Sequence, residues 1–559
     1  MAGSRLVCAA CGWTPGAIEV DPFPFRCPNA GTDDGDHVIR RSEAGVGPRT
    51  ADVGSQTSDF GPRTSDDIPI SQNPFIRYRR SLYSWHIARE HGLSDADYVA
   101  LVERIDAAVE RIAGRGFRVT PFSRSDSLSR ALGLDGDTTG GIWVKDETGN
   151  VAGSHKARHL MGIALYLEVL RRLGVDRAER PLTVASCGNA ALAAAVVARA
   201  IDRKLLVFVP DHAATSIVAQ LEALGAVVTR CSRGERSPDA GRRRSADIGH
   251  RTSDFGRREH APGDPPYLAF RQAVAAGALP FSCQGNENGL AIEGCETLGY
   301  EIVSSLAAPD PSSAAQDVSL ARFDRVFIQV GGGALASACI EAFTESVRAG
   351  RLASMPRIHA VQTRGAYPLK RAYDLVVDQI FERLAASSPG TRLSFSTDDD
   401  RARYVLSTAA PALLDEAFAC ARMNRSSFMW PWETEPRSVA GGILDDETYD
   451  WAVVVEAMVR SGGYPVVVDE ATLEEANAFA RDATSIDVDH TGSAGLAGLL
   501  AVARSADKPQ PNERIVVLFT GARPRVCDRA AQTGQLASRR TSTSFVRRPA
   551  SRSRSTSRS

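Results

Sequence analysis

The chain has 559 residues, of which 43% are hydrophobic, and its formal net charge is −1. This length suffices for one large α/β core or for two subdomains, and it excludes a small domain held together by disulfides. The near-neutral charge provides no global field that would attract nucleic acid or an anionic membrane, so the composition favours work on small molecules.

The N-terminus, MAGSRLVCAACGW, lacks the basic start and apolar core of a signal peptide. No stretch of the sequence approaches the roughly 20 apolar residues of a membrane-spanning helix. The ten cysteines are scattered, several of them within apolar runs, which is typical of reduced, packed thiols. We therefore expect a cytoplasmic protein with no membrane partner.

The first cysteines indicate a metal site. Cys8 and Cys11 form a C-x-x-C pair, and Cys27 follows in FRCPNAGTDDGDH. Thiolates with this spacing can share a tetrahedral metal, and His37 is the natural fourth ligand because Ala30 stands where a second C-x-x-C would place a cysteine. A metal with four protein ligands would be structural. The alternative is that these cysteines are reduced and bind nothing.

A repeat of seven residues, with units such as RTADVG and RTSDFG, occurs in two separate places. The units begin at Arg49, Gln56, Arg63, Arg244 and Arg251. They contain glycine and too few apolar positions for the seam of a coiled coil. The polar regions that hold them, 42–70 and 232–266, are predicted to be a disordered linker and a disordered insertion.

The segment WVKDETGNVAGSHKARHLMGIALYLEVL, residues 143–170, predicts a strand, a glycine-containing turn and a helix. Ser154 is expected to be the N-cap of this helix, and Lys156 falls in its first turn. The helix dipole already presents positive charge there, so a lysine in this place is suited to act as a Schiff-base nucleophile. The alternative is an ordinary exposed lysine.

Two further segments predict loops that bind anions at the start of a helix. In TVASCGNAALAAAVVARA, residues 183–200, a strand leads through S-x-G-N into a helix, and Asn189 adds a side-chain amide. In RVFIQVGGGALASACIEAF, residues 325–343, three glycines allow the backbone to approach a phosphate closely. The triple glycine matches neither dinucleotide nor Walker motifs. The alternatives are a packed N-cap turn and a flexible turn.

The remaining apolar runs predict the architecture. Residues 205–210, 326–331, 358–363 and 515–521 are typical of buried parallel strands, and helical patterns alternate with them. We therefore expect a doubly wound α/β fold, with Thr520 at the carboxyl end of the last strand, where ligands bind. The basic, serine-rich tail 536–559 is predicted to be disordered and without function; the alternative is nonspecific binding of RNA or an acidic surface.

The order of lysine, S-x-G-N, triple glycine and strand-end hydroxyl resembles the tryptophan-synthase-β-like family of pyridoxal-phosphate (PLP) enzymes, fold type II, over residues 121–523. SVAGGILDD (438–446) and HTGSAGLAGLL (490–500) are similar to segments of threonine synthases and serine/threonine dehydratases. The resemblance implies two doubly wound parallel-sheet subdomains with the cofactor in the cleft between them, and a homodimer. Together with the composition it predicts four parts: a zinc-ribbon-like segment 1–41, the linker 42–70, a catalytic domain 71–535 and the tail.

The resemblance also implies roles for individual residues. Lys156 would form the Schiff base and move the α-proton of the substrate. The phosphate would be bound by Gly331, Gly332, Gly333 and Ala334, the ring nitrogen by Thr520, the phenolic oxygen by Asn189, and the substrate carboxylate by Ser186, Gly188 and Asn189. A neutral hydroxyl would not keep the ring nitrogen protonated, which favours elimination or replacement over transamination. Some threonine synthases begin with a similar cysteine-bearing segment, which implies structural zinc on Cys8, Cys11, Cys27 and His37.

These features favour a threonine-synthase-like lyase that acts on a small hydroxy or phosphohydroxy amino acid by β/γ-elimination or replacement. The alternative is an L-serine/L-threonine ammonia-lyase. His155 replaces the phenylalanine common in the family, and GARP follows Thr520 in place of G-x-G-L-K, so the substrate stays open. Two other classes are a catalytically silent scaffold, which the intact motifs disfavour, and a nucleic-acid-binding protein, which the net charge disfavours.

Overall fold

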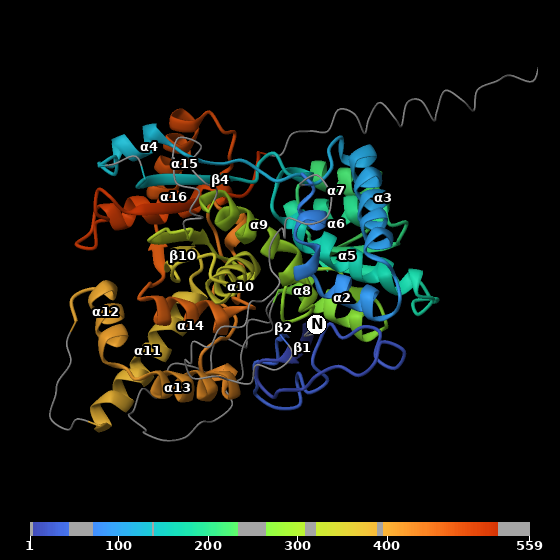
Figure 1. The fold of residues 1–559 in the computed structure, drawn as a ribbon, viewed down its shortest axis with the longest axis horizontal. Helices are drawn as coiled ribbons and strands as arrows, with labels where there is room; N and C mark the ends of the chain where they lie inside the picture. The colour runs from blue at the N-terminus through green and yellow to red at the C-terminus, as the bar shows by residue number, and fades with distance from the viewer. Residues whose placement is uncertain are drawn as a thin grey trace, which may run out of the picture. The chain divides into compact units, whose positions relative to one another are not determined.

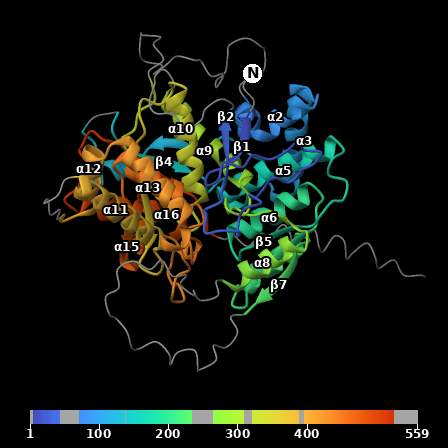
Figure 2. The ribbon, with the colours of Figure 1, turned by 90° about the horizontal axis from the view of Figure 1, so that it is seen from below.

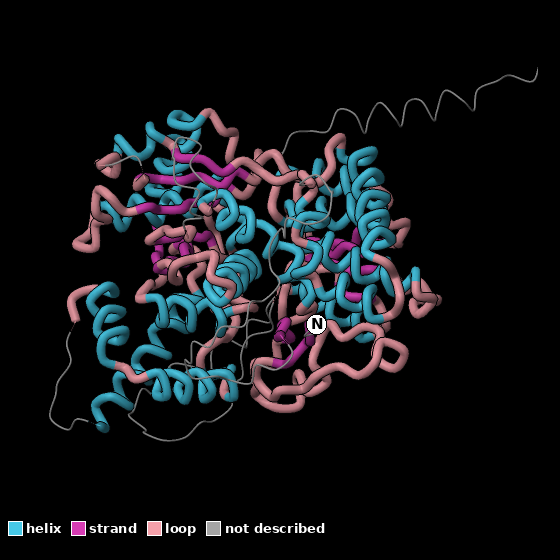
Figure 3. The backbone as a smooth tube through the Cα atoms, viewed as in Figure 1, coloured by secondary structure: helices cyan, strands magenta, loops and turns pink. Residues whose placement is uncertain are grey.

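A computed structural model of the chain describes residues 4–43, 71–136, 139–232, 264–307, 320–387 and 395–523. The heptapeptide units and the basic tail lie outside these residues. The strands of the described part form a six-stranded sheet, a four-stranded sheet and a two-stranded ribbon, visible as separate magenta groups in Figure 3. The orders are β11-β10-β9-β12-β4-β3, β7-β6-β5-β8 and β1-β2.

The strands have the following bounds: β1 Ser4–Cys8, β2 Ile39–Glu43, β3 Phe122–Arg124, β4 Gly141–Asp146, β5 Leu182–Ala185, β6 Leu205–Pro210, β7 Val227–Cys231, β8 Leu279–Pro280, β9 Arg325–Gln329, β10 Arg357–Thr363, β11 Val466–Val468 and β12 Arg514–Phe519.

The helices have the following bounds: α1 Pro74–Arg77, α2 Tyr83–Glu90, α3 Asp95–Ala113, α4 Asp126–Ala131, α5 Lys156–Arg172, α6 Asn189–Ala200, α7 Thr215–Ala223, α8 Pro265–Ala275, α9 Leu290–Leu306, α10 Ala334–Arg348, α11 Pro368–Ser387, α12 Asp398–Thr408, α13 Pro411–Met423, α14 Trp451–Ser461, α15 Glu470–Thr484 and α16 His490–Ala503. Short 3-10 turns are η1 Arg79–Ser81, η2 Val151–Gly153, η4 Arg425–Ser427 and η5 Gly441–Ile443.

The six-stranded sheet is parallel apart from β3, which runs antiparallel to β4. Helix α16 packs on β9, β10, β11 and β12, and α14 also packs on β10; in Figure 1, β10 lies between these two helices. Strands β9 and β12 are almost wholly buried because both faces are covered. The buried parallel strands predicted near 326–331, 358–363 and 515–521 are confirmed.

The four-stranded sheet is parallel throughout. Helices α6 and α8 pack on β5 and β6, and Figure 2 shows this group in cyan and green. Strand β6 coincides with the predicted run 205–210. The expected pair of wound parallel sheets is therefore present.

Helices α5 and α9 connect the two sheets, because α9 packs on α5 and also on α10. The crossing of α5 and α9 is close: a Cβ added to Gly162 would lie 2.8 Å from the Cα of Gly294. Residues Ala157 to Leu170 of α5 are all buried. The helix that begins with Lys156 is therefore fixed on every side.

Two predicted boundaries differ from the structure. Strand β2 continues to Glu43, inside the expected linker, because it pairs with β1 up to Ser4. Helix α8 begins at Pro265, inside the expected insertion, because proline is favourable in the first turn of a helix. Among the described residues, no helix combines the length and the apolar character required to cross a membrane.

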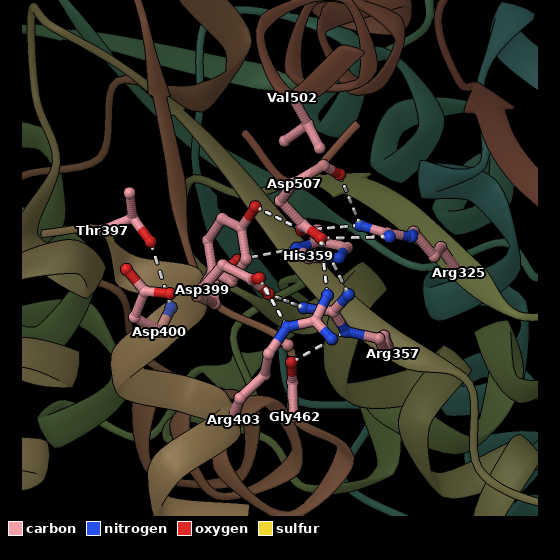
Figure 4. A network of polar contacts seen from close by, with 12 residues as sticks. Arg325, Arg357, His359, Thr397, Asp399, Asp400, Arg403, Gly462, Val502 and Asp507 are labelled. Carbon is pink, nitrogen blue, oxygen red and sulfur yellow. Dashed lines mark hydrogen bonds and ion pairs between the residues drawn. The ribbon is translucent and has the colours of Figure 1, made fainter. Parts of the chain in front are cut away.

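At the amino-terminal edge of the large sheet, several donors converge on the carboxylate of Asp507 (Figure 4). Arg325 donates to it at 2.7 and 3.1 Å, Arg357 and Arg403 each donate at 3.2 Å, and the hydroxyl of Tyr464 donates at 2.7 Å. Burial alone would raise the pKa of Asp507, but the bonds from Arg325 and Tyr464 outweigh it and hold the pKa well below its usual value.

Asp507→Asn is expected to lower the free energy of unfolding at pH 7 by about 2–3 kcal/mol, because charge-assisted hydrogen bonds are lost. Since the folded pKa is depressed, the contribution of Asp507 is present above its unfolded pKa of about 3.9 and is lost as the pH falls toward the folded value. Urea unfolding between pH 3 and 7 measures this difference. Asp482→Asn, at an exposed residue, is the control; an equal effect of both substitutions would contradict the prediction.

Candidate active site

Lys156 is the first residue of α5, which follows β4 in the chain. The N-cap is His155 and not the predicted Ser154. Ser154 precedes it in an extended conformation, and its hydroxyl accepts a hydrogen bond from the N–H of Lys156 at 3.4 Å. The backbone N–H and the ring Nδ1 of His155 both lie 3.3 Å from the carbonyl oxygen of Thr520. Ser154 forms a β-bridge with Gly521. The turn that carries Lys156 is thus attached to the carboxyl end of β12.

His155 is buried, and its pKa lies well below the usual value, first because of burial and then because of the positive charge of Lys156. The carbonyl of Thr520 can only accept, so Nδ1 carries the hydrogen. The imidazole is therefore neutral near pH 7 and packs against His159, with ring centroids 5.7 Å apart.

The S-x-G-N loop lies between β5 and α6. Gly188 is the N-cap of α6 and supplies no side-chain bond, so the first N–H groups of this helix have no side-chain cap. The N–H of Gly188 donates to the hydroxyl of Ser186 at 3.3 Å. The amide nitrogen of Asn189 lies 3.2 Å from the position of a Cβ on Gly521, which brings this loop to the end of β12.

The triple glycine connects β9 to α10, which begins at Ala334. Gly333 is the N-cap, with a φ of 98° that favours glycine, and no side chain caps the helix. A Cβ on Gly332 would lie 2.9 Å from the ring of Tyr449, and one on Gly333 would lie 3.0 Å from Thr448. Only glycine leaves room for the backbone here, so an anion could approach these N–H groups closely.

Residues 445–450 cover this glycine loop. The hydroxyl of Thr448 donates to the carbonyl of Gly331 at 2.9 Å, and the N–H of Asp450 donates to the carbonyl of Gly332 at 3.0 Å. The carboxylate of Asp450 accepts from the N–H of Gly285 at 3.3 Å, and burial raises its pKa to about 7.

Asp445 is an internal anion in the glycine loop. Its carboxylate lies against Gly331, close to the position that a Cβ on this glycine would take, and the backbone of Gly332 helps to stabilise its charge. Burial raises the pKa of Asp445 to about 6, although the charge of Lys156 and the bond from Gly332 act in the opposite direction. The glycine loop thus already lies beside one carboxyl group of the chain, and the charge of Lys156 lowers the pKa of that group.

Thr520 lies directly after β12 and is 2% exposed. Its hydroxyl oxygen accepts a hydrogen bond from the side-chain amide of Gln329, the last residue of β9. Because β9 and β12 are neighbouring parallel strands, the predicted hydroxyl and the predicted glycine loop meet at the same edge of the sheet.

The four predicted metal ligands also come together. The ligand atoms of Cys8, Cys11, Cys27 and His37 all lie within 4.8 Å of one another. His37 Nε2 lies 2.7 Å from a carboxylate oxygen of Asp33, an arrangement that orients histidine ligands in metal sites. All nine cysteines of the described residues are free thiols.

The residues that sequence reasoning did not identify are Gln329, Asp445, Tyr449 and Asp450. Gln329 resembles an ordinary strand residue in VFIQVG. The other three lie in or directly after SVAGGILDD, which was recognised only as a similar segment. An acidic run such as DDE is usually a solvated turn, and only the folded chain places it over the glycine loop.

The chain was compared with known proteins. The model of the family described as "Pyridoxal-phosphate dependent enzyme" matches residues 114–410, more than half of the chain. The Mus musculus protein "Serine dehydratase-like" is 32% identical over 123 residues, which are 22% of this chain and 33% of that protein. The match therefore spans a third of the length of this curated relative.

Three solved structures are similar to this chain over most of their length. Maize serine racemase is 16% identical, with 78% of this chain and 98% of that chain covered and a TM-score of 0.45. The processed form of threonine deaminase isoform 2 from Solanum lycopersicum is 16% identical (80% and 90% covered, TM-score 0.44), and a fungal L-serine ammonia-lyase from Rhizomucor miehei is 14% identical (75% and 98% covered, TM-score 0.46). The match to the family model, together with the lysine, the glycine loop and the two wound sheets, places the chain in the family of pyridoxal-phosphate dependent enzymes.

Proposed function

We propose that the chain is a PLP-dependent lyase that eliminates the side-chain hydroxyl of a small amino acid, as an L-serine/L-threonine ammonia-lyase does. The observation that carries the proposal is the place of the glycine loop. It lies beside the carboxyl group of Asp445, whose pKa the charge of Lys156 lowers, and it meets Thr520 at one edge of the sheet. The name of the mouse relative, "Serine dehydratase-like", supports the same substrate class.

The residues fit the cofactor. The N–H groups from Gly331 to Ala334 would bind its phosphate, in the place beside the loop where the carboxyl group of Asp445 lies. Thr520 would face the ring nitrogen, Asn189 the phenolic oxygen, and Lys156 would hold the aldehyde carbon covalently. When bound, PLP withdraws electrons from the α-carbon of an amino acid.

Two parts of this chain would then act on the substrate. The loop of Ser186, Gly188 and Asn189, at the uncapped start of α6, would bind its carboxylate, which fixes the α-carbon. The amine of Lys156 would take the α-proton as a general base. The side-chain hydroxyl would then take up that proton from the Lys156 ammonium and leave as water.

A threonine-synthase-like reaction on a phosphohydroxy amino acid is the second candidate, supported by the N-terminal Cys/His cluster. It would require cationic groups for a second phosphate. The titratable side chains beside the glycine loop instead include the carboxyl groups of Asp445 and Asp450, and the charge of Lys156 lowers the pKa of both. This acidic surrounding favours a neutral hydroxyl as the leaving group.

The assay that separates these candidates compares keto-acid formation from L-serine and L-threonine with phosphate release from O-phosphohomoserine. We expect keto acid from a hydroxy amino acid and little phosphate release. Phosphate release at a higher kcat/KM would reverse the order of the two candidates. If neither keto acid nor phosphate formed, both candidates would be contradicted.

Asp445→Asn is expected to tighten PLP binding about tenfold or more, because the phosphate dianion no longer competes with a carboxylate for the glycine loop. The dissociation constant is measured by titrating the cofactor-free protein and following absorbance. Asp211→Asn, an exposed substitution, should leave it unchanged. Weaker binding in Asp445→Asn would instead mean that Asp445 helps to hold the cofactor.

We also propose that Cys8, Cys11, Cys27 and His37 hold one structural zinc ion, since four protein ligands leave no open position. Cys27→Ser is expected to reduce bound zinc from about one ion per chain to well below that, and to lower the melting temperature. Metal analysis and thermal unfolding measure both effects. Cys231→Ser lies outside the cluster and is the control; a full zinc content in Cys27→Ser would contradict the proposed ligand set.

A further inference from the structure

Gln329 is 4% exposed and lies directly before the triple glycine. Its side-chain nitrogen donates to the carbonyl oxygens of Gly492 at 2.9 Å and of Leu518 at 3.2 Å, and it also contacts the hydroxyl oxygen of Thr520. Carbonyl oxygens only accept hydrogen bonds, so the –NH2 group of Gln329 must be the end that faces them.

The opposite orientation of the amide is unfavourable. It would place the oxygen of Gln329 against the carbonyls of Gly492 and Leu518, where acceptors would face acceptors. In the observed orientation this oxygen is buried and, among the described residues, has no hydrogen-bond partner. The protein thus leaves one acceptor unsatisfied and keeps the –NH2 group toward Thr520.

This orientation determines what the hydroxyl of Thr520 can do. An amide nitrogen donates and does not accept, so the hydroxyl hydrogen cannot point at Gln329. Within the part of the chain that the structure describes, no other polar atom bonds the hydroxyl of Thr520. Its hydrogen is therefore left for an acceptor that is not part of the chain.

We propose that Gln329 is a positioning residue that fixes the hydroxyl of Thr520 as a hydrogen-bond donor to the ring nitrogen of PLP and so keeps that nitrogen unprotonated. The inference rests on the proposed function, in which Thr520 faces the ring. A nitrogen that accepts a bond from a fixed donor has no place for a proton of its own. The cofactor is then a weaker electron sink, and proton transfer by Lys156 favours elimination over transamination.

The experiment uses full-length protein loaded with PLP labelled with 15N at the ring nitrogen. In the unaltered protein, the 15N resonance should be that of an unprotonated nitrogen with a hydrogen-bond donor. Gln329→Met keeps the length of the side chain but removes the –NH2 group, so the hydroxyl of Thr520 is no longer fixed and can turn toward the carbonyl of Leu518. The resonance should move to the position of a nitrogen without a donor, and PLP binding should weaken about threefold to tenfold.

Two comparisons make this test specific. Thr520→Val removes the hydroxyl and should move the resonance in the same direction, and the double variant should show no further change. Gln362→Met is the matched control: Gln362 is buried on neighbouring β10, and its amide bonds the carbonyl of Val330 and the N–H of Lys370. It should affect stability without moving the resonance.

The outcomes separate the two proposals. If Thr520→Val moves the resonance and Gln329→Met does not, Gln329 has no positioning role, although Thr520 keeps the role proposed above. If neither variant moves it, Thr520 does not face the ring, and both statements fail. A protonated ring nitrogen in the unaltered protein would also overturn the inference. Should Gln329→Met not fold, Gln329→Leu, which likewise carries no donor, should give the same shift.

Discussion

Lys156→Ala is expected to lower the rate of elimination by about 10³-fold or more and to abolish the visible absorption of the PLP-loaded protein. The amine is proposed both to hold the cofactor covalently and to move the α-proton, and loss of a general base alone commonly costs about 10²- to 10⁴-fold. Steady-state kinetics and an absorption spectrum of the protein mixed with PLP measure the two effects. Lys156 itself is only partly buried, whereas the rest of α5 packs firmly, so the substitution should not unfold the chain.

Lys204→Ala is the matched control, because Lys204 is an exposed lysine next to β6 in the other sheet. It should leave both the spectrum and the rate unchanged. A Lys156→Ala variant that retained the spectrum and more than about a tenth of the rate would assign the chemistry to another amine.

Arg158→Met is expected to lower the free energy of unfolding by about 3–5 kcal/mol, the usual cost of breaking a buried ion pair. The guanidinium of Arg158 is fully buried and donates to Glu147 at 2.9 Å and to Glu301 at 2.7 Å. Lys145, also buried, pairs with Glu301. Without Arg158, the buried carboxylates of Glu147 and Glu301 would be left with the ammonium group of Lys145 alone.

The pH dependence of this effect has a definite sign. Burial raises the pKa of Glu301, but the charges of Arg158 and Lys145 outweigh burial and hold the pKa below its usual value. The contribution is therefore present above the unfolded pKa of about 4.3 and is lost as the pH falls through the folded value. The difference between Arg158→Met and the unaltered protein should shrink below about pH 4.

Urea unfolding at pH 7 and at pH 3 measures these values. Arg504→Met is the control, since the pair of Arg504 and Glu475 is about half exposed and should contribute less than about 1 kcal/mol. If Arg158→Met lowered the free energy of unfolding no more than this control does, water would have to reach the side chains of Arg158, Glu147 and Glu301 and screen their charges.

Local patterns in the sequence were sufficient to predict the elements and motifs that depend on short stretches. The run 205–210 predicted β6 because it is short, apolar throughout and contains β-branched valines, which favours a buried strand. Cys8, Cys11, Cys27 and His37 were predicted as a group because their spacing is constrained by metal chemistry, and the ribbon β1–β2 brings them together. The family is confirmed by its matching model.

Contacts between distant segments were not predictable in this way. Asp445 lies more than a hundred residues from Gly332, and nothing in the letters DDE indicates that one carboxylate enters a glycine loop. Gln329 was missed because its role depends on the carbonyls of Gly492 and Leu518, which approach it only when α16 packs on β9 and β12. Ser154 was predicted as the N-cap, but α5 begins one residue later, after the 3-10 turn η2, with His155 at the N-cap; the hydroxyl of Ser154 still accepts the N–H of Lys156. The expected homodimer stays a prediction.

The central claim is that one amine, that of Lys156, holds the cofactor beside the glycine loop. The most direct test is to load the full-length protein with PLP, reduce it with borohydride, and identify the modified peptide by mass spectrometry. We expect a visible band that reduction removes and a single label on Lys156. A colourless protein, as a catalytically silent scaffold would give, or a label on any other lysine would contradict the account.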